Sequence, residues 1–411
     1  MGCAPSKHKV TDQPVTKDNS RNNNNGDVID CDVKSSSQNI QDITGDEKDE
    51  RNIAENDDTY KVGTKNSLHA ALSSTNLSNL STNEAGYRAR SVSIKTDDGY
   101  TVDDVDTSKK ADVDAQVLYN AMRGLSTNIN DLIEVIIPCH GSYRQTLKNK
   151  YEEKYNEDLR KEVKRTTSSS LQYLLTNLLL ETKEFLVFLM KEYVDEKQYI
   201  LLSELLNAWN STSINEAKLQ YQLVYGSTFE SDVTNSLDDL VPKSFKDVII
   251  PSCQLHRDES CRELDDEIIQ KEADKLSQGS DDISALLVQT TYNAATLSAI
   301  FKSYKLKYYL DITDSIDIEF HDDTKRFLTT MVQVCEDSPK YFATQLKEAI
   351  KKNDEKRFIN ILIGRQQLDL STILQAYEEL HDGQTLIQTV SKHFSSDFGK
   401  AICLLLKKHT Q

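Results

Sequence analysis

The chain has 411 residues, of which 37% are hydrophobic, and its formal net charge is −17. So acidic a chain argues against nucleic acid as a partner. Its seven scattered cysteines are odd in number and form no CxxC pair, which indicates reduced thiols in a cytosolic protein. No apolar run is long enough to predict a membrane-spanning helix, and no secretory signal peptide is expected at the start.

The first predicted element is a lipid anchor in the opening stretch, MGCAPSKHKV. Gly2 and Ser6 fit the pattern for N-myristoylation, and Cys3 stands where a palmitoyl group usually joins a myristoyl group. Lys7 and Lys9 suit an anionic leaflet. Chance matches to so short a pattern are common, but a membrane-binding fold behind it would raise its weight. One myristoyl chain binds weakly and two anchor stably, so we expect covalent myristate on Gly2 and palmitate on Cys3.

The segment 1–110 is predicted to be a disordered tether behind this anchor. It is rich in Asn, Asp, Ser, Thr and Lys, as in RNNNNGDVIDCD, and contains almost nothing to bury. Such a composition cannot offset the entropy cost of ordering the chain.

From about Val113 the sequence becomes a series of amphipathic helices. Segments such as VLYNAMRGL and LQYLLTNLLL show the i, i+3, i+4, i+7 apolar spacing, and strand-like alternation is nearly absent. A four-fold repeat runs through them, in which two rings lie four residues apart. The pairs are Tyr151 and Tyr155, Tyr221 and Tyr225, Tyr304 and Tyr308, and Tyr377 and His381. The expected fold is all-α, with four or five helices in each repeat.

These units resemble annexin repeats, most clearly in AMRGLSTNINDLIEVIIPCHGSYRQTLKNKYEEKYNEDLRKEV and in the last repeat, where Arg365 ends the second helix. The resemblance implies a curved disc of four five-helix repeats that meets a membrane through calcium. The repeats are expected at 111–192, 193–260, 261–337 and 338–411. The second is expected to be shortened, because YILLSELLNAW runs straight to a third helix. Among annexin relatives, the divergent character is similar to the alpha-giardins of diplomonad protists.

An annexin-type calcium site combines backbone carbonyls of a Gly-rich loop with a carboxylate about forty residues later, because calcium takes oxygen ligands. Repeat one keeps a vestigial loop at Met122, Gly124 and Ser126, but the acid position holds Thr166. Repeat two has no loop. Repeat four has Lys351-Lys352-Asn353 at the loop and His393 at the acid position, so its cations oppose calcium.

Repeat three offers the remaining candidate. The resemblance places the carbonyls of Lys275, Ser277 and Gly279 in one site with the Glu319 carboxylate. The alternative is purely structural: Gly279 ends one helix and Ser280 caps the next. Both interpretations stay open at the level of sequence.

No catalytic motif is present, so the protein is not expected to be an enzyme. The first hypothesis is a lipid-anchored protein that binds acidic phospholipid with a residual calcium response. The second is a structural adaptor, in which the helical core binds microtubule or flagellar cytoskeleton proteins. Either places the protein at the cytoplasmic face of the plasma or flagellar membrane.

Overall fold

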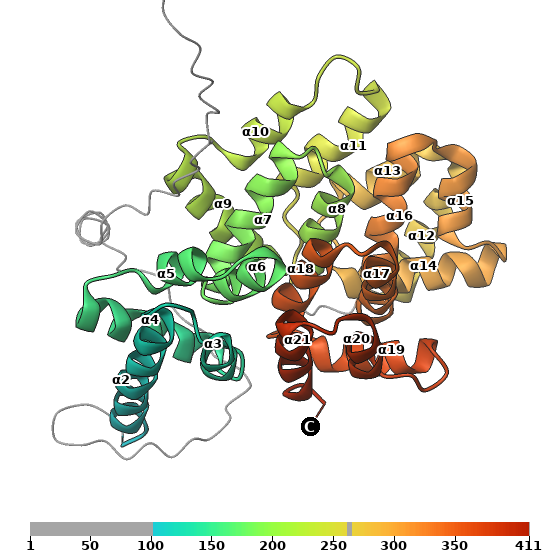
Figure 1. The fold of residues 1–411 in the computed structure, drawn as a ribbon. Coiled ribbons are helices and arrows are strands. Elements are labelled where there is room, and N and C mark those ends of the chain that lie inside the picture. The colour runs from blue at the N-terminus through green and yellow to red at the C-terminus, as the bar shows by residue number, and fades with distance from the viewer. Residues whose placement is uncertain (1–101, 261–264, 411) are drawn as a thin grey trace, which may run out of the picture. The chain divides into compact units, whose positions relative to one another are not determined.

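The computed structural model describes residues 102–260 and 265–410, and within these ranges every regular element is helical (Figure 1). The predicted all-α class is thereby confirmed for the described chain. The segment 1–101, with Gly2 and Cys3, lies outside it. The helices are α2 (Val102–Met122), α3 (Ile129–Ile136), α4 (Gly141–Tyr155), α5 (Leu159–Thr166), α6 (Ser169–Leu178), α7 (Thr182–Asp195), α8 (Tyr199–Ala208), α9 (Ser211–Tyr225), α10 (Phe229–Ser236), α11 (Lys243–Gln254), α12 (Asp266–Lys275), the 3-10 helix η1 (Leu276–Gln278), α13 (Ser280–Gln289), α14 (Ala294–Tyr308), α15 (Ile312–Glu319), α16 (Asp322–Glu336), α17 (Ser338–Lys352), α18 (Glu355–Arg365), α19 (Leu370–Leu380), α20 (Leu386–His393) and α21 (Asp397–Lys407).

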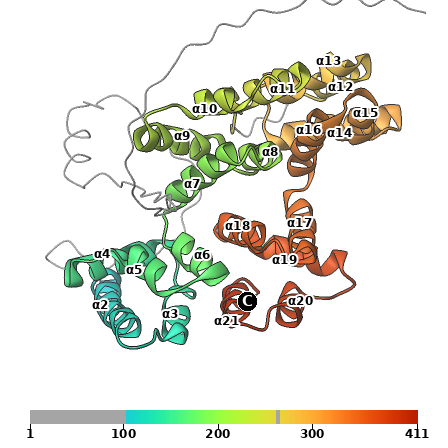
Figure 2. The same ribbon diagram turned by 45° about the horizontal axis from the view of Figure 1, so that its top comes forward.

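Packing divides these helices into four repeats of five α-helices. In each repeat the first helix packs against the third: α2 on α4, α7 on α9, α12 on α14 and α17 on α19. The last repeat also contacts the first, since α21 packs against α3 and α6 (Figure 2). A continuous core of buried apolar side chains runs through all four repeats, which is the main stabilising contribution to such a fold.

The two rings of each predicted aromatic pair pack against each other at the end of the third helix of their repeat. The ring centroids of the four pairs lie 5.0, 4.7, 5.1 and 4.2 Å apart in chain order. In repeats two, three and four the hydroxyl of the first ring also reaches the fourth helix. The partners are Asp232 for Tyr221, Ser315 for Tyr304 and Thr389 for Tyr377. In these three repeats a hydroxyl of the ring pair therefore connects the third helix to the fourth.

The folded part begins earlier than the composition suggested. Helix α2 starts at Val102, whereas the disordered segment was expected to continue to residue 110. Ala111 is fully buried, and the Lys110 ammonium lies 4.8 Å from the centre of the Tyr143 ring. These contacts extend the helix before the apolar periodicity becomes visible in the sequence.

Repeat two is not shortened in its helices, so that expectation is wrong. Helix α7 packs against α9 and α10 in the same way that α2 packs against α4 and α5, and it is therefore the first helix of repeat two. It begins after a capping box of Glu181 and Glu184. The sequence TKEFLVFLMKEYV had been assigned to repeat one. Only the loop between α7 and α8 is reduced, to residues 196–198.

A buried ion pair joins repeats two and four. The Arg357 guanidinium on α18 binds the Glu204 carboxylate on α8 through its two terminal nitrogens. The Tyr341 hydroxyl donates to the same carboxylate at 3.0 Å. The side chains of Arg357 and Glu204 are only 10% and 7% exposed. Since neither charge faces water, each depends on the other for its electrostatic stabilisation.

Candidate functional site

The calcium candidate in repeat three lies where α12 passes into α13. Helix α12 ends at Lys275, η1 covers Leu276–Gln278, and Gly279 alone separates η1 from α13. Gly279 has φ +129°, a backbone conformation that favours glycine, and open space surrounds the position of a Cβ. The segment is thus a tight helical turn rather than an extended glycine loop.

The same turn decides the capping alternative. Gly279 occupies the N-cap position of α13 and Ser280 is already the first helical residue. No side chain caps this helix, so the expectation that Ser280 caps α13 is wrong. The Gly279 carbonyl accepts from the Ile283 amide at 3.2 Å, and the Ser277 hydroxyl donates to the Asp274 carbonyl at 2.7 Å.

Glu319 is the last residue of α15, which packs against α13. Its side chain is exposed, and among the described residues it takes part in no ion pair. The nearby Asp317 instead pairs with Lys325 at 3.0 Å. Of the predicted ligands, the structure places Lys275, Ser277 and Gly279 within one turn and leaves the Glu319 carboxylate open to a cation.

Repeat four shows how residues at this spacing meet. Asn353, in the loop between α17 and α18, accepts a 2.9 Å hydrogen bond at its Oδ1 from Nε2 of His393 at the end of α20. The two residues are forty apart in sequence, as Gly279 and Glu319 are. The loop and the fourth helix of this repeat are therefore joined by a direct contact, and the expected acid position holds His393 instead of a carboxylate.

Repeat two closes its loop with a side-chain cation. Lys197, which has φ +53° between α7 and α8, binds Asp238 at 2.8 Å beyond the end of α10. The Lys197 hydrogen bond and the Leu240 amide lower the pKa of Asp238 below its ordinary range. An ammonium of the reduced loop is thus paired with a carboxylate beyond the fourth helix.

Repeat one has an open loop, and its Arg123 guanidinium pairs with acids at the fourth helix. The loop covers residues 123–128 and Gly124 has φ +117°. Arg123 pairs with Glu157 and lies 3.9 Å from Glu162. Thr166, at the expected acid position, donates to the Glu162 carbonyl at 2.8 Å. Met122 is buried, whereas Ser126 is exposed.

Comparison with known proteins agrees with this architecture. The annexin family model matches residues 113–178 and 341–405, which are the first and last repeats. Mouse annexin A13 is 28% identical over 309 residues, covering 72% of this chain and 95% of that protein. Rat annexin A4 is 25% identical, covering 71% of this chain and 93% of that protein. The chain belongs to the annexin family.

Solved structures extend the annexin likeness to the whole described core. Annexin III superposes with a TM-score of 0.66 at 22% identity, over 72% of this chain and 93% of that one. A calcium-bound alpha-14 giardin superposes with a TM-score of 0.60 at 16% identity, over 72% of this chain and 99% of that one. At this identity the likeness establishes the annexin fold, and the narrower similarity to giardins stays a prediction.

Annexins are typically calcium-dependent phospholipid-binding proteins that attach peripherally to membranes. Within the described residues, no helix is long and apolar enough to cross a bilayer. Nor do three or more His, Cys, Asp or Glu side chains gather there as a metal-binding group. The annexin-type site expected in repeat three needs only one carboxylate beside loop carbonyls.

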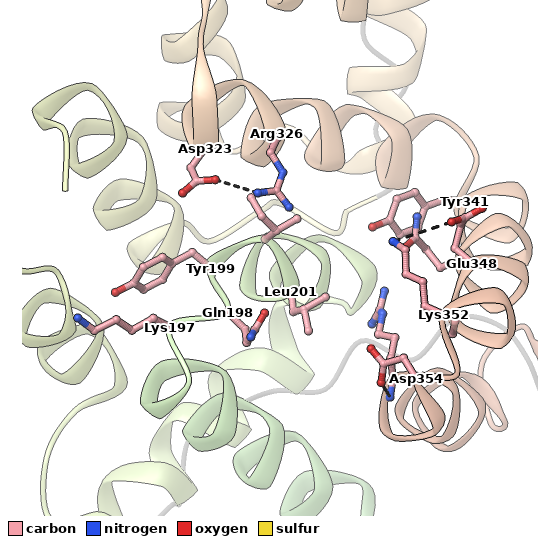
Figure 3. A pocket seen from close by; sticks show the side chains of 14 residues that line it. Lys197, Gln198, Tyr199, Leu201, Asp323, Arg326, Tyr341, Glu348, Lys352 and Asp354 are labelled. Atoms are coloured by element: carbon pink, nitrogen blue, oxygen red, sulfur yellow. Dashed lines mark hydrogen bonds and ion pairs between the residues drawn. The ribbon is translucent and has the colours of Figure 1, made fainter. Parts of the chain in front are cut away.

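Sequence reasoning missed a cavity beside the loops of repeats two and four. Figure 3 shows it between the starts of α8 and α16 and the end of α17. Lys197 and Lys352, from the two loops that lack glycine, are among its lining residues. Lysines at both altered loops were the available signal, although the sequence analysis considers only those of repeat four, and only as cations that oppose calcium.

Proposed function

We propose that this annexin is a lipid-anchored membrane protein whose calcium response is confined to repeat three. Calcium would be held by the carbonyls of Lys275, Ser277 and Gly279 and by the Glu319 carboxylate. The exposed Glu319 side chain is the observation that carries the proposal, because a hard cation takes oxygen ligands and this carboxylate pairs with no cation in the described part of the chain.

The other three repeats support the same assignment by contrast. Arg123 in repeat one and Lys197 in repeat two bring cations to the loop, and Asn353 binds His393 in repeat four. In each of these repeats, side chains at the expected calcium position are already bonded to one another. A protein with one calcium site needs additional attachment, and myristoyl on Gly2 with palmitoyl on Cys3 would supply it at the cytoplasmic face of a membrane.

Cosedimentation with phosphatidylcholine vesicles that contain phosphatidylserine tests the proposal. The full chain with Gly2→Ala removes acylation, and binding is measured in calcium and in EGTA. A calcium-dependent increase in the bound fraction is expected. The same bound fraction in both conditions would contradict the calcium assignment. Absence of binding in both would favour the adaptor hypothesis, in which the core binds microtubule or flagellar proteins.

A further inference from the structure

The cavity beside the two glycine-free loops has a volume of about 320 Å³. It is lined from repeat two by the start of α8, from repeat three by the start of α16, and from repeat four by α17 and α18. This size lies at the lower end of the range for small-ligand sites, roughly 300–1,000 Å³. A phosphate group with part of its substituent fits such a volume.

Four cationic side chains line the cavity, and two of them are available to a ligand. Arg326 on α16 and Lys352 at the end of α17 lie on two sides of it, with Leu201 between them (Figure 3). Their side chains are 66% and 71% exposed. Lys197 adds a third charge at the margin, where it binds Asp238.

The contacts that now hold these two cations are weak. Arg326 pairs with Asp323 at 3.0 Å, three residues earlier on the same helix, and both side chains are more than half exposed. Lys352 lies 3.9 Å from Glu348, which is nearer to Lys351 at 3.5 Å. Exposed pairs of this kind contribute little free energy, so an incoming anion can replace their carboxylates.

Arg357 and Asp354, which also line the cavity, have partners within the protein. Arg357 is committed to the buried Glu204 carboxylate. Asp354 accepts from the Arg357 backbone amide at 2.9 Å and caps α18. Asp354 keeps its negative charge in this contact, and the other two acids of the lining, Asp323 and Glu348, are the present partners of Arg326 and Lys352.

Helix geometry adds to the positive potential. Helices α8, α16 and α18 all begin at the cavity, since Gln198, Asp323 and Asp354 at their N-terminal ends line it. These helices have 10, 15 and 11 residues. Asp354 already caps α18, whereas α8 and α16 have no side-chain cap. The unpaired amides and partial positive charge at such uncapped N-termini favour phosphate.

We propose that this cavity binds a phosphate group without calcium, through Arg326 and Lys352 with Lys197 at its margin. The arginine supplies a planar fork of donors that matches phosphate, and the lysine supplies a mobile charge. Where repeats two and four have lost a calcium loop, the protein brings its own cations instead. This inference rests on the proposed function in so far as an acidic phospholipid supplies the phosphate.

The test compares two double variants of the full chain, each in a Gly2→Ala background and in EGTA. The site variant is Arg326→Gln with Lys352→Gln. The control is Arg165→Gln with Lys400→Gln, which removes the same charge from residues whose exposed i,i+3 ion pairs resemble those of the site. Probes are phosphatidylcholine vesicles with phosphatidylserine, measured by cosedimentation, and inorganic phosphate, followed by amide NMR shifts. Thermal melting verifies that both variants fold.

We expect the site variant to lose roughly tenfold to a hundredfold in affinity, as charge-assisted hydrogen bonds to the ligand disappear, while the control changes far less. Loss of vesicle binding identifies a lipid headgroup as the source of the phosphate, and loss of inorganic phosphate binding alone identifies a free phosphate. Equal losses in the site and control variants, or no binding by the parent protein to either probe, would overturn the proposal. Because calcium is absent throughout, failure here leaves the Glu319 assignment intact, and Glu319→Gln should leave these affinities unchanged.

Discussion

Asn353 and His393 lie forty residues apart and are joined by a 2.9 Å hydrogen bond in repeat four. The contact connects the loop after a first helix with the end of a fourth helix, which are the two parts of an annexin-type calcium site. Gly279 and Glu319 hold the corresponding places in repeat three. The contacts between the loop after the first helix and the end of the fourth helix thus differ from repeat to repeat.

The ion pair in repeat two predicts a pKa change. Lys197→Gln should raise the pKa of Asp238 part of the way to its ordinary value, because the hydrogen bond from the Leu240 amide at 3.0 Å remains. A depressed carboxylate pKa stabilises the folded state above the unfolded pKa, and this contribution is lost as the pH falls through the folded pKa. Carboxyl NMR titration measures the shift.

Lys243→Gln is the matched control for that titration, since Lys243 is an exposed lysine at the start of the next helix. It should leave the pKa of Asp238 nearly unchanged. A similar shift in both variants would mean that general charge, rather than the Lys197 contact, sets the pKa.

The buried pair between repeats two and four predicts a large loss of stability. Glu204→Gln leaves the Arg357 charge buried without its counterion, so the free energy of unfolding should fall by about 3–5 kcal/mol. Urea denaturation measures it. Asp397→Asn, which breaks the exposed pair with Lys400, should cost less than about 1 kcal/mol. Equal losses would show that Glu204 contributes no more than a surface acid.

In repeat one, we expect that adding a carboxylate alone does not create a calcium site. In Thr166→Glu the new acid lies one turn from Glu162, and the Arg123 guanidinium is close enough to bind it. Thr166→Glu alone should therefore gain little calcium affinity, whereas Arg123→Gln with Thr166→Glu should gain a weak site at the Gly124 loop. Calorimetry in a Glu319→Gln background isolates this signal. Strong calcium binding by the single variant would show that Arg123 does not compete.

The anchor predicts a graded loss of membrane attachment. Gly2→Ala should abolish both acylations and leave the protein diffuse in cells, because palmitoylation follows membrane contact by the myristoyl group. Cys3→Ser should give weak, reversible binding through one chain. Cell fractionation distinguishes the two variants. Fractionation is done in EGTA and high salt, which remove binding through the repeat-three site and through the phosphate site. A Gly2→Ala protein that stays in the membrane fraction under these conditions would rule out the two-lipid account.

Periodicity in the sequence was sufficient to predict the helices and the aromatic pairs, because rings four residues apart must share a helix face. The start of α2 was missed, since burial of Ala111 leaves no strong apolar signal. Helix α7 was assigned to the wrong repeat because its loop to α8 lacks the glycines that mark such a boundary. The Lys197–Asp238 pair could not be predicted, because it joins residues 41 apart whose proximity depends on the fold.

The most direct test of the account is calcium titration calorimetry on the full Gly2→Ala protein and its Glu319→Gln variant. Glu379→Gln, at an exposed glutamate near the end of α19, is the control. The parent and the control should bind calcium at one site with modest affinity, and Glu319→Gln should weaken it by about tenfold or more, since the one carboxylate ligand is lost. Unchanged calcium binding in Glu319→Gln would contradict the assignment of the site to repeat three.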